Sequence, residues 1–194
     1  MATADPIRDP KQLYKLAEYW IEKGNYRNYA MIVSGAHTAL RISDLLRLKW
    51  DDVYDKKLRE FRSHITLTEK KTEKQKIIAL NPKAIEALRL YFPHRRGSYI
   101  FTNNRGNEKP ISRVQAWRVI RAAAAAIKAA GRIACHSLRK TFGYFAWKAG
   151  ALPVMLMDIF NHSSFETTRR YLGITQDDRD RIYLKLTLFR EARV

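Results

Sequence analysis

Apolar side chains recur at helical spacing along most of this sequence, and this periodicity limits the choice of fold more than any other feature. Leu13, Leu16 and Trp20 lie three and four positions apart in residues 11–23, and Gly24 follows that segment. Such spacing indicates an amphipathic helix, and glycine is a common helix end. Further helices are expected at residues 26–40, 41–48, 82–91, 112–130, 137–149, 153–160, 165–171 and 177–189. The chain is thus predicted to be mainly α-helical.

The centre of the chain changes to the pattern of β-strands. Apolar and polar residues alternate in residues 63–68, and residues 76–80 form a second short run of strand-favouring residues. These two runs predict a hairpin, whose tip at residues 69–75 is crowded with charge. Residues 99–102 would add a third strand. We therefore expect an α+β fold, mainly helical, with a small three-stranded antiparallel sheet.

The domain organisation is predicted to be simple. The chain has 194 residues, of which 46% are hydrophobic, and this is enough for one packed core. No repeat or low-complexity linker divides it. We therefore expect residues 1–194 to form a single domain, with a flexible N-terminus at residues 1–10 and a C-terminal helix and tail at residues 177–194.

The charge of the chain indicates a polyanionic partner. Lys and Arg number 37 against 19 acidic residues, which gives a formal net charge of +18. This excess is larger than solubility requires, and nucleic acid is the partner that it favours most. Charge alone leaves DNA and RNA equally open, and it also leaves open a basic globular protein that binds neither.

Cysteine content and hydropathy bear on the compartment. Cys135 is the only cysteine, so neither an intrachain disulfide nor a multi-cysteine metal cluster can form. Residues 1–10 lack the apolar core of a signal peptide, and no apolar run approaches the eighteen or so residues of a membrane span. We therefore expect a cytoplasmic protein that does not associate with membranes.

Three motifs occur in order along the chain. The first is ALRISDLLRLKWDDV at residues 39–53, which contains Arg41. The second is HSLR, whose spacing places His136 and Arg139 on one face of a helix. The third is NHSSFETTRRY at residues 161–171. Each motif alone is weak evidence, because arginine on a helix is usually a solvated charge and tyrosine is usually a core residue.

Taken together, the motifs resemble those of the tyrosine recombinase, or phage integrase, family. The first is similar to the family's arginine box, with Asp44 in the acidic position, and the second is similar to its His-x-x-Arg box. The third resembles the segment that ends in the family's nucleophilic tyrosine, although Asn161 replaces the usual glycine. The charged hairpin tip resembles the lysine-bearing turn of the family. The resemblance spans roughly residues 26–175.

The resemblance implies a catalytic set composed of Arg41, Lys71, His136, Arg139, His162 and Tyr171. Tyr171 would attack a DNA phosphodiester and form a 3′-phosphotyrosyl bond. The two arginines and His162 would hold the non-bridging oxygens, because guanidinium stays charged and offers a planar fork of donors. His136 would accept the phenol proton.

The leaving group and the absence of cofactors follow from the same resemblance. Lys71 would protonate the departing 5′ oxygen, with Lys70 and Lys74 as competitors for this role. Asp44 would orient a base or an arginine. The sequence lacks the clustered carboxylates that two magnesium ions need, so no metal and no cofactor is predicted. A thiol nucleophile at Cys135 is disfavoured, since neighbouring residues on a helix point apart.

The function implied is that of a site-specific recombinase, an integrase or invertase of a prokaryote, phage or mobile element. It would act on double-stranded DNA at the nucleoid, as a homo-tetramer built from monomers, with accessory DNA-bending proteins as further partners. Residues 177–194 would pack either on a neighbouring protomer or on the rest of the same chain. The core-binding domain of longer members is lacking, as in fimbrial-switch invertases or an excised fragment. Two alternatives stay open: a DNA-binding regulator that does not cut, and relaxation of DNA by a type IB topoisomerase-like mechanism.

Overall fold

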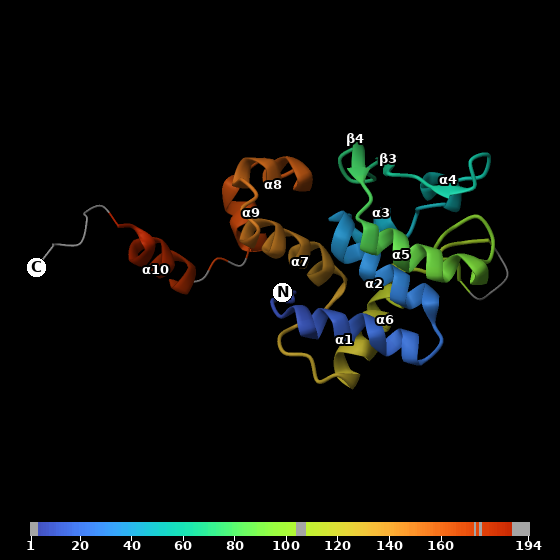
Figure 1. Cartoon of the computed structure of the whole chain (residues 1–194), viewed down its shortest axis with the longest axis horizontal. Coiled ribbons are helices and arrows are strands. Elements are labelled where there is room, and N and C mark those ends of the chain that lie inside the picture. Colours follow the sequence, from blue (N-terminus) through green and yellow to red (C-terminus); the bar gives the residue numbers. More distant parts are fainter. Residues whose placement is uncertain (1–3, 104–107, 173, 175, 188–194) are drawn as a thin grey trace, which may run out of the picture.

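The computed structural model describes residues 4–103, 108–172, 174 and 176–187, and it is mainly helical (Figure 1). Its helices are α1 (Pro10–Glu22), α2 (Tyr26–Thr38), α3 (Ile42–Leu45), α4 (Trp50–Val53), α5 (Pro82–Tyr91), the 3-10 turn η1 (Phe92–His94), α6 (Arg113–Ala126), α7 (Cys135–Lys148), α8 (Pro153–Phe160), α9 (Phe165–Leu172) and α10 (Gln176–Lys185). The strands are β1 (Tyr54–Asp55), β2 (Glu60–Phe61), β3 (His64–Thr68) and β4 (Gln75–Ala79). None of the described helices has the length and apolar character of a membrane span.

Short polar residues start the long helices. Asp9 caps α1, Asn25 caps α2 and Asn81 caps α5, each by accepting a hydrogen bond from a backbone N–H of the first turn. Ser112 and Gln115 form a reciprocal capping box at the start of α6. These side chains satisfy N–H groups that have no partner inside the helix. The predicted boundaries at residues 82–91 and 153–160 agree with the structure.

The predicted hairpin is present, but the three-stranded sheet is wrong. Strands β3 and β4 pair antiparallel, and β1 and β2 form a separate two-stranded sheet. Residues 99–102 make only isolated bridges, from Tyr99 to Lys49 and from Thr102 to Pro110. The segment is buried, with Ile100 and Phe101 both 0% exposed, and its backbone pairs with residues 48–50 and not with the hairpin: the N–H of Ile100 donates to the Leu48 carbonyl.

Several helices end differently from the prediction, and the helix expected at residues 26–40 already stops at Thr38. The helix expected at residues 41–48 is reduced to the single turn of α3. The helix expected at residues 112–130 stops at Ala126, and Lys128 takes a left-handed conformation with φ 49°. The last helix, expected at residues 177–189, is α10 and ends at Lys185; residues 188 and 189 lie outside the described residues. The observed ends are set by local turns that the apolar pattern does not reveal.

The apolar core is divided into two clusters. The larger one joins α1, α2, α5 and α6, and contains Leu16, Met31 and Ile120 among many others. The smaller one consists of Ala39, Leu156, Phe160 and Leu172. Helix α7 packs against both α2 and α9 and so connects the two clusters. The three sequence motifs, at residues 39–53, 136–139 and 161–171, come together in the region between the two clusters.

We predict that Gly143→Val destabilises the protein by about 1–3 kcal/mol, the usual effect of overfilling a core. Gly143 lies on α7, and a Cβ atom there would come within 2.9 Å of the Phe160 ring. Urea unfolding measures the change. Ala125→Val, on the exposed side of α6, is the control and should shift stability by no more than about 0.5 kcal/mol. Equal stability of the two variants would contradict the packing described here.

Candidate active site

Two arginines from distant parts of the chain, Arg41 and Arg139, converge on the end of α8. Arg139, on α7, is 1% exposed and donates hydrogen bonds to the carbonyl oxygens of Ala39 and Phe160, the latter at 2.8 Å. Arg41 Nη2 lies 3.5 Å from the same Phe160 oxygen. The two guanidiniums therefore meet at one carbonyl oxygen.

The backbone before Arg41 explains why its side chain reaches this place. Helix α2 ends at Ala39, which takes a left-handed conformation with φ 56°. Arg41 then stands in an extended conformation as the residue before α3. The chain thus turns sharply between two helices, and this turn directs Arg41 toward the C-terminal end of α8.

The predicted nucleophile lies next to the predicted base. The hydroxyl of Tyr171, on α9, and Nε2 of His136, on α7, form a short hydrogen bond. The His162 ring lies 4.6 Å from the Tyr171 ring, centroid to centroid, in an edge-on arrangement. Tyr171 is therefore placed between two imidazoles, one of which can take its proton directly.

His162 is held by residues of its own motif. Asn161 takes the left-handed conformation, with φ 50° and ψ 50°, which the family's glycine would also permit. The Nδ1 atom of His162 lies 3.0 Å from the hydroxyl of Thr168, which is 0% exposed. The turn after α8 and the start of α9 together fix the orientation of this imidazole.

Burial and neighbouring cations keep both imidazoles neutral. The pKa of His136 falls to about 4 because of burial and of the charges of Arg139, Lys140 and Arg41. The pKa of His162 also falls to about 4, through burial and then Arg139 and Arg41. Burial raises the pKa of Tyr171, and the nearby Arg139 opposes this rise. At neutral pH the site therefore holds a protonated phenol beside a neutral base.

A cavity of about 810 Å³ opens over these groups. Its walls carry five of the six predicted residues, namely Arg41, Lys71, His136, His162 and Tyr171. Among the competing lysines, Lys70 also lines this cavity, whereas Lys74 lines a different one, beside β4. Lys70 and Lys71 thus line the same cavity as Tyr171, and Lys74 does not.

Two charged residues of the site were not predicted from the sequence. Lys76, on β4, donates through Nζ to the carbonyl oxygen of Ile159, and its Nζ lies 3.5 Å from Oε1 of Glu69. Glu69 is 0% exposed at the end of β3. Strand periodicity was the available signal for Lys76, since alternation places it on the same side of β4 as the half-buried Ile78.

Asp44 contributes through the backbone of the hairpin tip. Its carboxylate is 3% exposed and accepts a hydrogen bond of 3.0 Å from the N–H of Lys70. This contact ties the arginine box to the turn that carries Lys71. The expected contact with a base or an arginine of the site is thus replaced by one with the backbone of the lysine-bearing turn. Within the part of the chain that the structure describes, no three His, Cys, Asp or Glu residues form a metal-binding group.

Sequence comparisons place the chain in a family. A model of the phage integrase family matches residues 8–177. The chain is 38% identical over 178 residues to "Probable integrase/recombinase YoeC" of Bacillus subtilis, which covers 91% of this chain and 93% of that protein. It is 27% identical over 183 residues to "Tyrosine recombinase XerC" of Pelobacter propionicus, which covers 91% of this chain but 58% of that protein.

Solved structures have the same fold. XerA recombinase superposes with a TM-score of 0.76 at 22% identity, over 95% of this chain and 66% of that one. XerH recombinase bound to its palindromic difH substrate superposes with a TM-score of 0.75 at 17% identity, over 95% of this chain and 54% of that one. The chain therefore belongs to the phage integrase family of tyrosine recombinases. It spans nearly all of YoeC and between about half and two thirds of these longer relatives.

We predict that stability falls as the pH is lowered from about 6.5 to about 4. The unfolded chain takes up protons on His136 and His162 near pH 6.5, whereas the folded chain does so only near pH 4. The unfolded state binds more protons between these two pH values, so acid favours unfolding. The contribution of the two histidines to folding stability is complete above about pH 6.5. Urea unfolding at several pH values measures the slope. The double variant His136→Gln/His162→Gln should show a smaller slope, and an unchanged slope would contradict the assignment.

Proposed function

We propose that this chain catalyses site-specific DNA recombination by cleaving and rejoining DNA through a 3′-phosphotyrosyl bond at Tyr171. The observation that carries the proposal is the hydrogen bond between Tyr171 and His136, in a cavity that Arg41 and Lys71 also line. A protein that only binds DNA needs phosphate contacts, and it has no need of a phenol beside a base. Membership of the phage integrase family supports the same reaction.

The arginines would bind the scissile phosphate. The two Nη atoms of Arg139 are already engaged by the Ala39 and Phe160 carbonyls, which fixes the plane of its guanidinium before DNA arrives. Donors that are fixed in advance stabilise developing negative charge without reorganisation. With Arg41 and His162 they would hold the non-bridging oxygens of the pentavalent transition state.

The phosphate would also activate the base. Burial and nearby cations depress the pKa of His136, so it is a weak base in the free protein. A bound phosphate brings negative charge among the same cations, and this raises the pKa of His136 toward its usual range. The phenol oxygen of Tyr171 then forms the bond to phosphorus as its proton moves to His136. The bond to the 5′ oxygen breaks, and Lys71 gives that oxygen a proton.

Neither a metal ion nor ATP enters this scheme. Arginine side chains take the place of a metal in neutralising the phosphate. The phosphotyrosyl bond retains the energy of the broken phosphodiester, so rejoining requires no nucleotide. Residues 1–194 would form one catalytic domain acting in the reducing cytoplasm at the nucleoid, which the single cysteine, Cys135, permits.

Assembly on DNA would use the end of the chain. We expect a homo-tetramer on two duplexes, with accessory DNA-bending proteins where the site requires them. Helix α10 exposes apolar side chains, namely Ile182, Tyr183 and Leu184. Its start is attached to α7 by the ion pair of Asp178 and Lys148. Such an apolar surface supports packing of residues 177–194 on a neighbouring protomer, and the alternative is packing within the same chain.

The central test is covalent capture. Duplexes selected for tight binding from a random pool, each with a nick beside the candidate cleavage position, should give a protein–DNA adduct that survives denaturation. Tyr171→Phe should give none, because it lacks the phenol oxygen. Tyr14→Phe, at an exposed tyrosine of α1, is the matched control and should retain the adduct. Tight binding without any adduct would instead favour the non-cutting regulator, and supercoil loss without exchange between two sites would favour the topoisomerase.

A second prediction concerns the geometry of Arg139. Arg139→Lys keeps the charge but loses the planar fork that holds two carbonyl oxygens. We expect single-turnover cleavage to fall by about 10²–10³-fold, as for loss of one donor in a pre-formed anion site. Arg89→Lys, exposed on α5 and outside the cavity, should leave the rate unchanged. A rate for Arg139→Lys within a few-fold of the parent would contradict the proposed role.

A further inference from the structure

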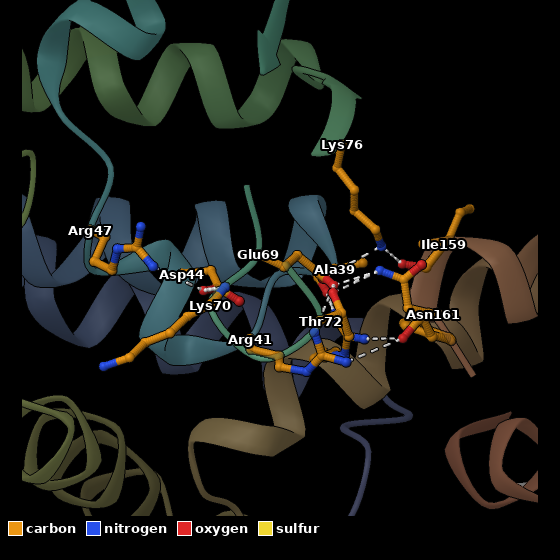
Figure 2. Close-up of polar contacts among 12 residues, drawn as sticks. Ala39, Arg41, Asp44, Arg47, Glu69, Lys70, Thr72, Lys76, Ile159 and Asn161 are labelled. Atoms are coloured by element: carbon orange, nitrogen blue, oxygen red, sulfur yellow. Dashed lines mark hydrogen bonds and ion pairs between the residues drawn. The ribbon is translucent and has the colours of Figure 1, made fainter. Parts of the chain in front are cut away.

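One buried carboxylate, that of Glu69, contacts two charged and two polar side chains beside the cavity (Figure 2). Oε2 of Glu69 lies 2.8 Å from Arg41 Nη1 and accepts hydrogen bonds from Thr72 at 2.7 Å and from Asn161 Nδ2 at 2.5 Å. Its Oε1 lies 3.5 Å from Nζ of Lys76. The side chain is 0% exposed, so it reaches these partners from within the protein and not from the surface.

The carboxylate is ionised in spite of its burial. Burial alone would raise the pKa of Glu69, but the hydrogen bonds from Thr72, Asn161 and Arg41 outweigh it and lower the pKa to about 2. A buried ion pair contributes little net stability compared with apolar residues of similar size. Stability therefore gives no sufficient reason for a charge at this position, and the arrangement of its partners gives a better one.

Three partners of Glu69 either belong to the proposed catalytic set or are the sequence neighbours of its members. Arg41 belongs to the set itself. Thr72 is the neighbour of Lys71 in the hairpin tip, and Asn161 is the neighbour of His162 in the turn after α8. One carboxylate thus joins the arginine box, the lysine-bearing turn and the histidine-bearing turn. Movement of Glu69 would displace all three relative to the phosphate.

Asn161 also has a side-chain amide, which its backbone conformation does not require. Its left-handed conformation would suit glycine at least as well. Glycine, however, has no side chain, whereas the amide of Asn161 donates to Glu69. The replacement of the family's usual glycine is thereby explained by the carboxylate that it meets, and the two residues form a matched pair.

We propose that Glu69, paired with Asn161, is a positioning residue that holds Arg41, the Lys71 turn and the His162 turn in register for phosphoryl transfer. This inference rests on the proposed function. Glu69 does not touch the phosphate in this scheme, so its loss should slow cleavage more than it weakens DNA binding.

Reciprocal substitutions test the pair. Glu69→Gln removes the charge that Arg41 and Lys76 face, and Asn161→Asp sets two carboxylates against each other. Each should lower single-turnover cleavage of the nicked duplexes by about tenfold, within the range of coupling between contacting residues, with DNA affinity within about twofold of the parent. The double variant Glu69→Gln/Asn161→Asp restores one amide and one carboxylate, and it should recover most of the lost rate.

Controls separate positioning from folding. Asp55→Asn removes another paired carboxylate, that of the Arg62 ion pair outside the cavity, and should lower stability without changing the cleavage rate. If Glu69→Gln does not fold, Asn161→Gly provides the second test, because glycine keeps the left-handed turn and removes only the amide. A several-fold slower rate for Asn161→Gly is expected.

The results that overturn the inference are distinct from those that overturn the proposed function. A parental cleavage rate in folded Glu69→Gln or in Asn161→Gly would overturn it, and so would a double variant that is no faster than the single ones. In all these cases the parent protein still forms the adduct. Absence of an adduct with the parent protein itself would instead remove the proposed function, whatever the variants do.

Discussion

Arg139 is almost completely buried and donates to the carbonyl oxygens of Ala39 and Phe160, which lie at the C-terminal ends of α2 and α8. Such ends carry partial negative charge, because their last carbonyl groups have no partner within the helix. A guanidinium is therefore stabilised between two helix ends. Since a buried charge without partners is very costly, this interaction fixes how far apart α2, α7 and α8 can lie. The positions of Arg41, His162 and the cavity depend on that spacing.

The cations held near one another by this packing help to set the protonation state of the site before DNA binds. Burial and these cations together keep His136 and His162 neutral, and burial keeps the phenol of Tyr171 protonated. The free site therefore holds unbalanced positive charge without a reactive phenolate. In the proposed reaction, a phosphate would be the counter-ion of this site, and its arrival would both balance the charge and make the base stronger.

Much of the fold could be predicted from the sequence, because the signals for it are local. Capping residues and prolines mark α5 and α8, and the alternation of residues 63–68 marks the hairpin. The motif residues around Tyr171 could be named by resemblance to the tyrosine recombinases, although their roles still await experiment. The third strand could not be judged correctly, since the burial of Ile100 and Phe101 and the pairing of this segment with residues 48–50 depend on the tertiary structure.

Glu69 and Lys76 were missed for a related reason. A charged hairpin tip is typical of a solvated turn, and nothing near it in the sequence indicates an inward-facing carboxylate. The partners of Glu69 come from elsewhere in the chain; Asn161 lies 92 positions away. The contacts of Glu69 form only when the hairpin packs against the end of α8, so the sequence alone does not reveal them.

The division of the core into two clusters makes the assembled site depend on the packing of both clusters. Tyr171 packs against the smaller cluster, whereas Ile42, the residue after Arg41, packs against the larger one. Partial opening of the chain, with α8 and α9 detached, would carry the phenol away from the groups that make a phosphate attackable. Under the proposed function, a chain in this partly opened state would not cut DNA, and cleavage would be confined to the completely folded protein.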